Sequence, residues 1–243
     1  MIYMKASKFA LLCSLVFGIG SVFMGCSSNQ SQTGSQEADK ALQSMNEMVK
    51  QFPDKKGFHK VLQHWNFSMP SGELFEWSRN SSANQADYAV VLMSDEFTKA
   101  GLDLQKMDKE KWLIKPAEVD NGKQLPNRLI KPYNVSDKNE SADGSEDSLR
   151  RLFKQNPDIV KEDKATNSYA LILGDGIEVR WAQTLGKGEY DMAFVLNAQP
   201  FALAGLDLKK IQESGWIFTG ETSKAASSSE GSRGELIKKF KLK

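Results

Sequence analysis

The sequence predicts an α+β fold made of two tandem repeats of an α-β-β-β-α-β unit, each with an antiparallel meander sheet, related by a pseudo-twofold axis. Two observations lead to this prediction. The pentapeptide Ala-Gly-Leu-Asp-Leu occurs twice, at residues 100–104 and 204–208. The same shift of 104 residues, applied without a gap to residues 46–114, gives 19 identities in 69 pairs. Self-similarity at one fixed spacing indicates an internal duplication in which each copy folds as one supersecondary unit.

The first unit is expected over residues 39–115. Apolar residues recur at helical spacing from Leu42 to Phe52, which predicts a helix over residues 38–52 that ends before Pro53. Four later segments show the period-two alternation or the continuous apolar run that is typical of β-strands. They are residues 64–69, 73–79, 88–93 and 112–114.

The repeated pentapeptide has the chemistry of a helix end followed by a helix start. If Gly101 adopts the left-handed conformation that ends a helix, Phe97 and Leu102 take the two positions whose apolar contact accompanies that ending. Asp103 then caps the next helical turn, and Ser94 is expected to cap the preceding helix. We therefore interpret the pentapeptide as a structural device and not as a catalytic motif.

The second unit, expected over residues 148–220, repeats this order. It begins with a helix that ends before Pro157, and Asn197 is the expected cap of its second helix. Gly174-Asp175-Gly176 predicts a tight hairpin. Its strand segments are residues 169–173, 177–183, 192–196 and 216–218. A unit of this size buries little surface on its own, so we expect the two to pack face to face or to share one sheet.

Two segments lie outside the predicted units. Residues 116–147 carry three prolines and then a polar, acidic run, which predicts a linker that is disordered or draped over the first unit. Residues 221–243 are Ser-rich and then basic and apolar. We expect this tail to form a final edge strand or a solvated end, and the alternative is contact with an anionic membrane surface or wall polymer.

The N-terminus has the pattern of an export signal. Lys5 and Lys8 precede an uncharged apolar run from Phe9 to Met24, and Gly25-Cys26 is followed by a polar stretch. This pattern resembles a bacterial lipoprotein signal peptide. The resemblance implies that residues 1–25 are removed, that Cys26 is lipidated and that residues 26–38 form a flexible tether. The alternative is an uncleaved N-terminal anchor. Either interpretation places the rest of the chain on the extracytoplasmic face of the cell membrane or the outer membrane.

The composition narrows the function further. Without the two leader lysines the chain has 30 basic and 31 acidic residues, so it lacks the basic excess typical of nucleic-acid binding, and we expect no nucleic-acid partner. No cysteine follows Cys26, so the folded part is expected to have neither a disulfide nor a thiolate metal site. The sequence also contains no Gly-x-Ser-x-Gly elbow, phosphate-binding loop or His-Glu-x-x-His motif. We therefore expect neither catalytic residues nor a bound metal or cofactor.

Three groups of residues are candidates for binding a ligand or a metal, and each can instead be explained by a role in the fold. Trp65, Trp77 and Trp181 lie on expected strands and are the candidate ligand-binding residues of an aromatic groove, or else they fill the core. His59 and His64 are five residues apart, a spacing that presents no metal pair on one helix or one strand. Methionines of the first unit suit Cu(I) together with these histidines, but the second unit has aliphatic residues at the equivalents of three of them, which favours core packing.

The sequence leaves three functions open. The first is a lipid-anchored, extracytoplasmic, non-enzymatic binding or adaptor protein, attached to the membrane through lipid on Cys26 and presenting a surface to an envelope protein or polymer. The second is a small-ligand receptor that uses the cleft between the units, because pockets form preferentially at the interfaces of domains. The third is a copper-handling lipoprotein that uses the histidines and methionines.

Overall fold

The computed structural model describes residues 29–81, 85–120, 123–135, 140–182, 192–221 and 233–242. The predicted signal peptide and Cys26 lie outside these residues. Among the described residues, no helix is both long and apolar enough to cross a membrane.

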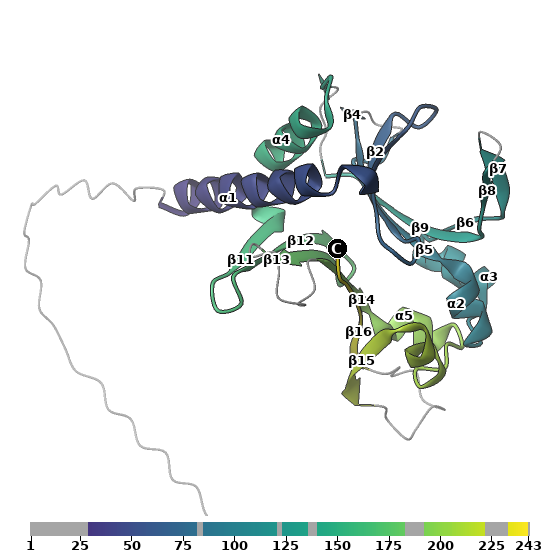
Figure 1. Ribbon diagram of the computed structural model, residues 1–243. Helices are drawn as coiled ribbons and strands as arrows, with labels where there is room; N and C mark the ends of the chain where they lie inside the picture. Colours follow the sequence, from purple (N-terminus) through teal and green to yellow (C-terminus); the bar gives the residue numbers. More distant parts are fainter. Residues whose placement is uncertain are drawn as a thin grey trace, which may run out of the picture.

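The chain forms two antiparallel sheets of six strands each, and the sheets lie in different parts of the molecule (Figure 1). The first sheet has the order β1-β2-β3-β5-β9-β6, and the second has the matching order β11-β12-β13-β14-β16-β15. The first sheet consists of β1 (Lys56–His59), β2 (His64–Ser68), β3 (Leu74–Ser78), β5 (Tyr88–Met93), β9 (Arg128–Tyr133) and β6 (Leu113–Lys115). The second consists of β11 (Val160–Asp163), β12 (Ser168–Gly174), β13 (Ile177–Ala182), β14 (Met192–Asn197), β16 (Arg233–Phe240) and β15 (Trp216–Glu221). The predicted α+β class and its duplication are confirmed.

Each sheet contains two more strands than the sequence predicted. β1 and β11 add an outer strand next to β2 and β12. β9 comes from the segment predicted as a linker, and β16 comes from the predicted tail. Because β16 pairs with both β14 and β15, it is an interior strand and not the edge strand or solvated end that we expected.

Two short ribbons complete the strands. β4 (Asn80–Ser81) pairs with β10 (Glu140–Ser141), and β7 (Glu118–Asp120) pairs with β8 (Lys123–Leu125). The ribbon of β7 and β8 lies in the predicted linker between β6 and β9, so most of that segment is folded.

The first helix is longer than predicted. α1 spans Asn29–Gln51, so it begins within residues 26–38, which we expected to form a flexible tether. The physical reason is helix propagation: once the apolar part of α1 is held by packing, the preceding residues extend the helix without a new nucleation step, each at a propensity cost of at most about 1 kcal/mol. The matching helix of the second unit, α4 (Ser145–Gln155), ends before Pro157 as predicted.

The two units exchange their first helices. α1 packs against α4 and against β11 of the second sheet, while α4 packs against β3 of the first sheet (Figure 1). Two hydrogen bonds fix α4 there: the Trp77 indole N–H donates to the carbonyl of Ser145 at 3.1 Å, and Arg151 donates to the carbonyl of Ser78 at 3.1 Å. The units therefore interlock around one hydrophobic core, with two separate sheets and not a common one.

The pentapeptide ends a helix in both units, as predicted. In α2 (Ser94–Lys99), the N–H of Leu102 donates to the carbonyl of Phe97 at 3.0 Å, and Gly101 has a φ of +90°. The second copy repeats this ending after α5 (Ala198–Leu203), where Gly205 has a φ of +95°. This is the glycine-ended geometry that satisfies the last carbonyls of a helix.

The two copies of the pentapeptide also meet each other. The N–H of Asp103 donates to the carbonyl of Ala204 at 2.9 Å, and the N–H of Asp207 donates to the carbonyl of Ala100 at 2.8 Å. This reciprocal pair places the pseudo-twofold axis between the copies. Aromatic rings cross the same junction in both directions, Phe97 with Trp216 at 5.3 Å and Phe201 with Trp112 at 5.4 Å between ring centroids.

Two of the three predicted helix caps are confirmed, and the third is wrong. Asp103 accepts a hydrogen bond from the N–H of Gln105 at 3.0 Å, and Asn197 accepts one from Gln199 at 3.1 Å, so both residues cap as expected. Ser94 does not cap α2, because the helix starts at Ser94 itself and the N-cap position belongs to Met93.

Candidate ligand-binding site

The three candidate tryptophans do not form an exposed groove. Trp77 and Trp181 are fully buried in the core, which was the structural alternative. Trp65 is partly buried, and its ring lies 4.5 Å from the ring of Phe58 between centroids. A ligand would not reach Trp77 or Trp181 without opening the fold.

The histidines are closer than their spacing suggested. β1 and β2 form a hairpin in which His59 is the direct cross-strand partner of His64, so both side chains share one face of the sheet. A spacing of five separates the two residues on a single helix or strand, whereas the turn of a hairpin brings them together. His59 Nδ1 accepts a hydrogen bond from the N–H of Leu62 at 3.1 Å, and His64 Nδ1 lies 3.5 Å from Glu76. The described residues contain no group of three or more His, Cys, Asp or Glu side chains that could hold a metal.

Four of the five methionines considered for copper lie in the core, and the fifth, Met93, is partly buried. Met45, Met48, Met69 and Met107 are each no more than 3% exposed. Their positions agree with the aliphatic residues that replace three of them in the second unit.

The pair Asp103 and Asp207 acts through backbone capping. Asp207 accepts hydrogen bonds from the N–H groups of Lys209 at 2.9 Å and Lys210 at 3.1 Å. These bonds, the one from Lys210 first, hold the pKa of the Asp207 carboxyl below its usual range, because they stabilise its charged form. Both aspartates are exposed residues of the helix junction.

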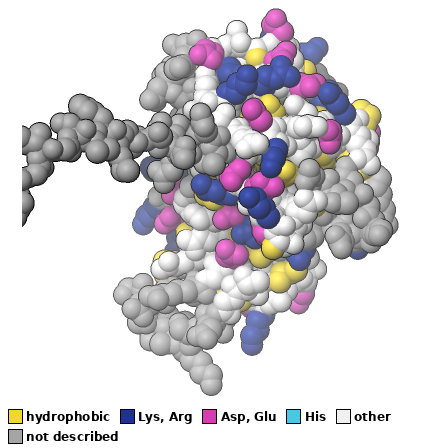
Figure 2. All heavy atoms as spheres, turned by 90° about the vertical axis from the view of Figure 1, so that its left-hand side faces the viewer, with side chains coloured by type: hydrophobic (Ala, Val, Ile, Leu, Met, Phe, Trp, Pro, Cys, Tyr) yellow, Lys and Arg dark blue, Asp and Glu magenta, His cyan; other side chains and the backbone are white. Residues whose placement is uncertain are grey.

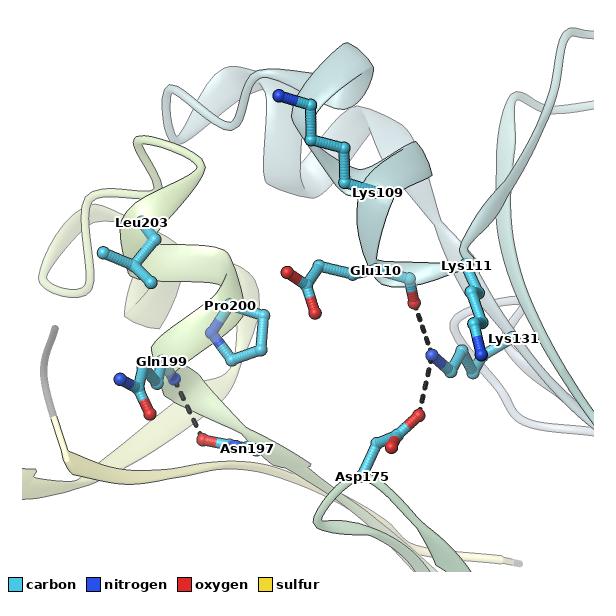
Figure 3. A pocket seen from close by; sticks show the side chains of 9 residues that line it. All are labelled: Lys109, Glu110, Lys111, Lys131, Asp175, Asn197, Gln199, Pro200 and Leu203. Carbon is cyan, nitrogen blue, oxygen red and sulfur yellow. Dashed lines mark hydrogen bonds and ion pairs between the residues drawn. The ribbon is translucent and has the colours of Figure 1, made fainter. Parts of the chain in front are cut away.

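A cleft of about 400 Å³ lies where the two units meet. The first unit contributes the end of the 3₁₀ helix η2 (Asp108–Glu110), the following Lys111 and a residue of β9. The second unit contributes the β12–β13 turn, the end of β14 and one side of α5 (Figure 3). Its lining residues are Lys109, Glu110, Lys111, Lys131, Asp175, Asn197, Gln199, Pro200 and Leu203.

Lys131 is the buried charge in the wall of this cleft. Only 4% of the residue is exposed. It lies on β9, directly opposite the buried Val90 of β5. Its ammonium group is 2.9 Å from the Asp175 carboxylate, across the junction between the units, and it also donates to the carbonyl of Glu110 (Figure 3). A buried lysine is rare unless it is paired, so this arrangement fixes one positive charge at the cleft.

The rim of the cleft has a residue with a strained backbone, and part of the opposite wall is apolar. Lys111 adopts a left-handed conformation with a φ of +59°, whereas the equivalent residue of the second unit is Gly215. Such a conformation is uncommon for a residue with a side chain and is found disproportionately at functional sites. On the other side, Pro200 and Leu203 of α5 form an apolar wall, and Leu203 is 54% exposed.

Three further hollows have similar volumes of about 330, 360 and 390 Å³. Among their described lining residues, none is a buried charged side chain. The cleft at the junction is therefore distinguished by its chemistry and not by its size.

A second, shorter repeat in the sequence could have pointed to Lys131. Leu129-Ile130-Lys131 is identical to Leu236-Ile237-Lys238, and the spacing of 107 differs from the 104 of the main repeat. This match does not appear at the fixed spacing of 104, because Leu129 follows Leu113 by 16 positions, whereas Leu236 follows Ile217, the equivalent of Leu113, by 19.

Comparison with known proteins gives no family for this chain: no family model matches it, and neither a curated protein nor a solved structure shows significant similarity to it. The features of the molecule that bear on its function are the geometry of the cleft and the sequence of the leader. On the face shown in Figure 2, the described Lys and Arg side chains are interspersed with Asp and Glu side chains.

Proposed function

We propose that this chain is a lipid-anchored, extracytoplasmic binding protein that holds a small ligand in the cleft between its two units. The observation that carries the proposal is the cleft of about 400 Å³, whose walls come from both units and include the buried Lys131. Its volume is within the range of small-molecule sites, and the junction of two domains is a preferred place for them.

The composition of the cleft supports recognition of a ligand. One wall combines the apolar Pro200 and Leu203 with the polar side chains of Asn197 and Gln199, and the fixed ammonium group of Lys131 lies on the opposite side. A pocket with an apolar wall and a few placed polar groups can orient a ligand as well as hold it. We propose a non-enzymatic role, since the lysine is engaged in an ion pair that suits charge recognition.

The proposal is tested by filling the cleft. Leu203→Trp adds a large side chain to its apolar wall, and Leu113→Trp is the matched control, because Leu113 is 48% exposed and lies on β6 outside the cleft. We expect the full chain to bind at least one compound of a panel of small acids, bases and neutral molecules. We expect Leu203→Trp to abolish that binding and Leu113→Trp to leave it unchanged, as measured by isothermal titration calorimetry. Equal binding by Leu203→Trp and the wild type would contradict the proposal.

The lipid anchor is a separate part of the proposal, and its support is the leader sequence alone. We expect Cys26→Ala to keep the signal peptide on the chain and to remove the lipid, since only the cysteine thiol can be acylated in the proposed way. Mass spectrometry of the membrane fraction measures both features. An unmodified N-terminal Met1 in the wild-type protein would favour the uncleaved anchor instead.

A role as an adaptor for an envelope protein or polymer stays a prediction. Pull-down from envelope extracts measures it directly, and recovery of no partner above background would count against it.

A further inference from the structure

Lys131 has a counterpart in the second unit. β9 and β16 occupy the same place in their sheets, and the registers that pair Val90 with Lys131 and Phe194 with Lys238 make the two lysines equivalent. Both are buried, at 4% and 5% exposure, and both reach across the junction to carboxylates of the other unit. The fold therefore contains two pseudosymmetric lysine sites.

The Lys238 site is filled by the chain itself. Its ammonium group is 2.8 and 2.7 Å from the two carboxylate oxygens of Glu96, and it also forms an ion pair with Glu73, which is fully buried. The indole N–H of Trp216 donates to Glu96 at 3.1 Å. Glu96 thus lies between a buried cation and an N–H donor, which is a complete recognition site for a carboxylate.

The Lys131 site lacks both internal carboxylates. The shift of 104 residues places Ile177 at the position of Glu73 and Pro200 at the position of Glu96. The carboxylate that remains is Asp175, whose side chain is 68% exposed. Pro200 lines the cleft, so open space is found beside Lys131 where the second site has a glutamate.

We propose that the cleft binds the carboxylate group of a small ligand, which takes beside Lys131 the place that Glu96 takes beside Lys238. This inference rests on the proposed function, because it names the chemical class of the ligand for the same cleft. The lining residues favour an anion overall, since three lysines outnumber Glu110 and Asp175. The apolar wall of Pro200 and Leu203 suits a short apolar body attached to the carboxylate.

Three probes with the same apolar body separate charge from shape. They are 4-methylpentanoate, 4-methylpentanamide and 4-methylpentylamine, titrated into the full chain in non-ionic detergent by isothermal titration calorimetry. The carboxylate is expected to bind at least tenfold more tightly than the amide or the amine, because only the carboxylate completes a charge-assisted hydrogen bond with the buried lysine.

Two variants test the position of the carboxylate. Lys131→Met removes the cation with little change in volume, and Asp175 remains solvated, so the fold is expected to persist. It should weaken binding of 4-methylpentanoate at least tenfold, whereas Lys50→Met, which removes another ion-paired lysine at a distant surface site, should not. Pro200→Glu restores the glutamate of the other site at the third position of α5, where glutamate is favoured. It should keep the melting temperature and abolish binding.

The outcomes distinguish this inference from the proposed function. If the amide or the amine binds as tightly as the carboxylate, or if Lys131→Met binds normally, the inference is wrong although a cleft ligand still exists. If none of the three probes binds, the inference also fails, and the Leu203→Trp comparison on the wider panel decides the proposed function independently. Normal binding by a folded Pro200→Glu chain would likewise overturn the inference.

Discussion

Gly101 and Gly205 each meet two demands at once. Their φ values of +90° and +95° need a residue without a side-chain penalty in the left-handed region. In addition, a Cβ atom on Gly101 would lie 3.2 Å from the carbonyl oxygen of Gly205, and one on Gly205 would lie 3.3 Å from the carbonyl oxygen of Gly101. The sequence predicted the first demand, but the second arises only because the two copies are in contact.

We expect Gly101→Ala to destabilise the fold by more than the backbone strain alone, which is about 1–2 kcal/mol. Gly215→Ala is the matched control: Gly215 has a φ of +85°, but a Cβ atom there would have no neighbour within 4 Å. Chemical denaturation measures both variants. If Gly215→Ala costs as much as Gly101→Ala, the close approach of the two copies contributes nothing to stability.

β9 and β16 are the two strands whose positions in the sheets the sequence did not predict. β9 contains Pro132, which usually argues against an interior strand. It is tolerated because β6 pairs only with Arg128 to Ile130, so the part of β9 that carries Pro132 has β5 as its one partner among the described strands. β16 follows a Ser-rich segment at the end of the chain, which predicts an edge strand or a solvated end, and its alternation of buried and exposed residues shows that it is a strand but not that it has a partner on either side.

We expect Ile237→Pro to prevent stable folding. Ile237 lies between Val195 and Ile217 of the two neighbouring strands, so its N–H points at a partner strand whichever side it faces. A proline there leaves the carbonyl of that partner unsatisfied, at about 1–3 kcal/mol, and also distorts the strand.

The control for this variant uses the edge strand β11. Alternate residues of an edge strand point their N–H away from the sheet, so one of Lys161→Pro and Glu162→Pro removes no ladder hydrogen bond. Circular dichroism during thermal unfolding should show the milder of the two close to wild type. Ile237→Pro with the same melting temperature would contradict the interior position of β16.

The exchange of α1 and α4 joins the two units around one hydrophobic core. Each sheet is covered by the first helix of the other unit, and the pentapeptides bind the far end of the junction (Figure 1). The sequence predicted a duplication and a pseudo-twofold relation, since both follow from the spacing of identities. It did not predict the exchange, because local patterns determine that a helix forms but not which sheet it covers.

We expect a chain that is cut at an introduced protease site within residues 136–139 to stay assembled, because α4 continues to pack on β3 after the cut. The two fragments should co-elute in size-exclusion chromatography. Separated in denaturant and refolded alone, neither should show a cooperative unfolding transition, since each lacks the helix that covers its sheet. Two independently folded fragments would rule out the interlocked arrangement.

The candidate site was the part least accessible from sequence. A cleft between the units was expected, but its lining residues were not. Lys131 lies in the segment predicted as a linker, and the importance of Pro200 is seen only when it is compared with Glu96, its equivalent in the first unit. The tryptophans were considered because aromatic residues can line grooves, and burial removed Trp77 and Trp181 from that role.

The reciprocal hydrogen bonds between the two pentapeptides have a consequence for which amino-acid substitutions the two copies can accumulate independently. A single unit with this surface would pair with an identical unit, and every substitution would then appear on both sides of the contact. Joining two units in one polypeptide removes that constraint, so one side can keep a glutamate against its lysine while the other side loses it. The duplication thus provides both a closed copy of the site and an open one, and the glutamate of the closed copy is the basis on which a carboxylate ligand is proposed for the open one.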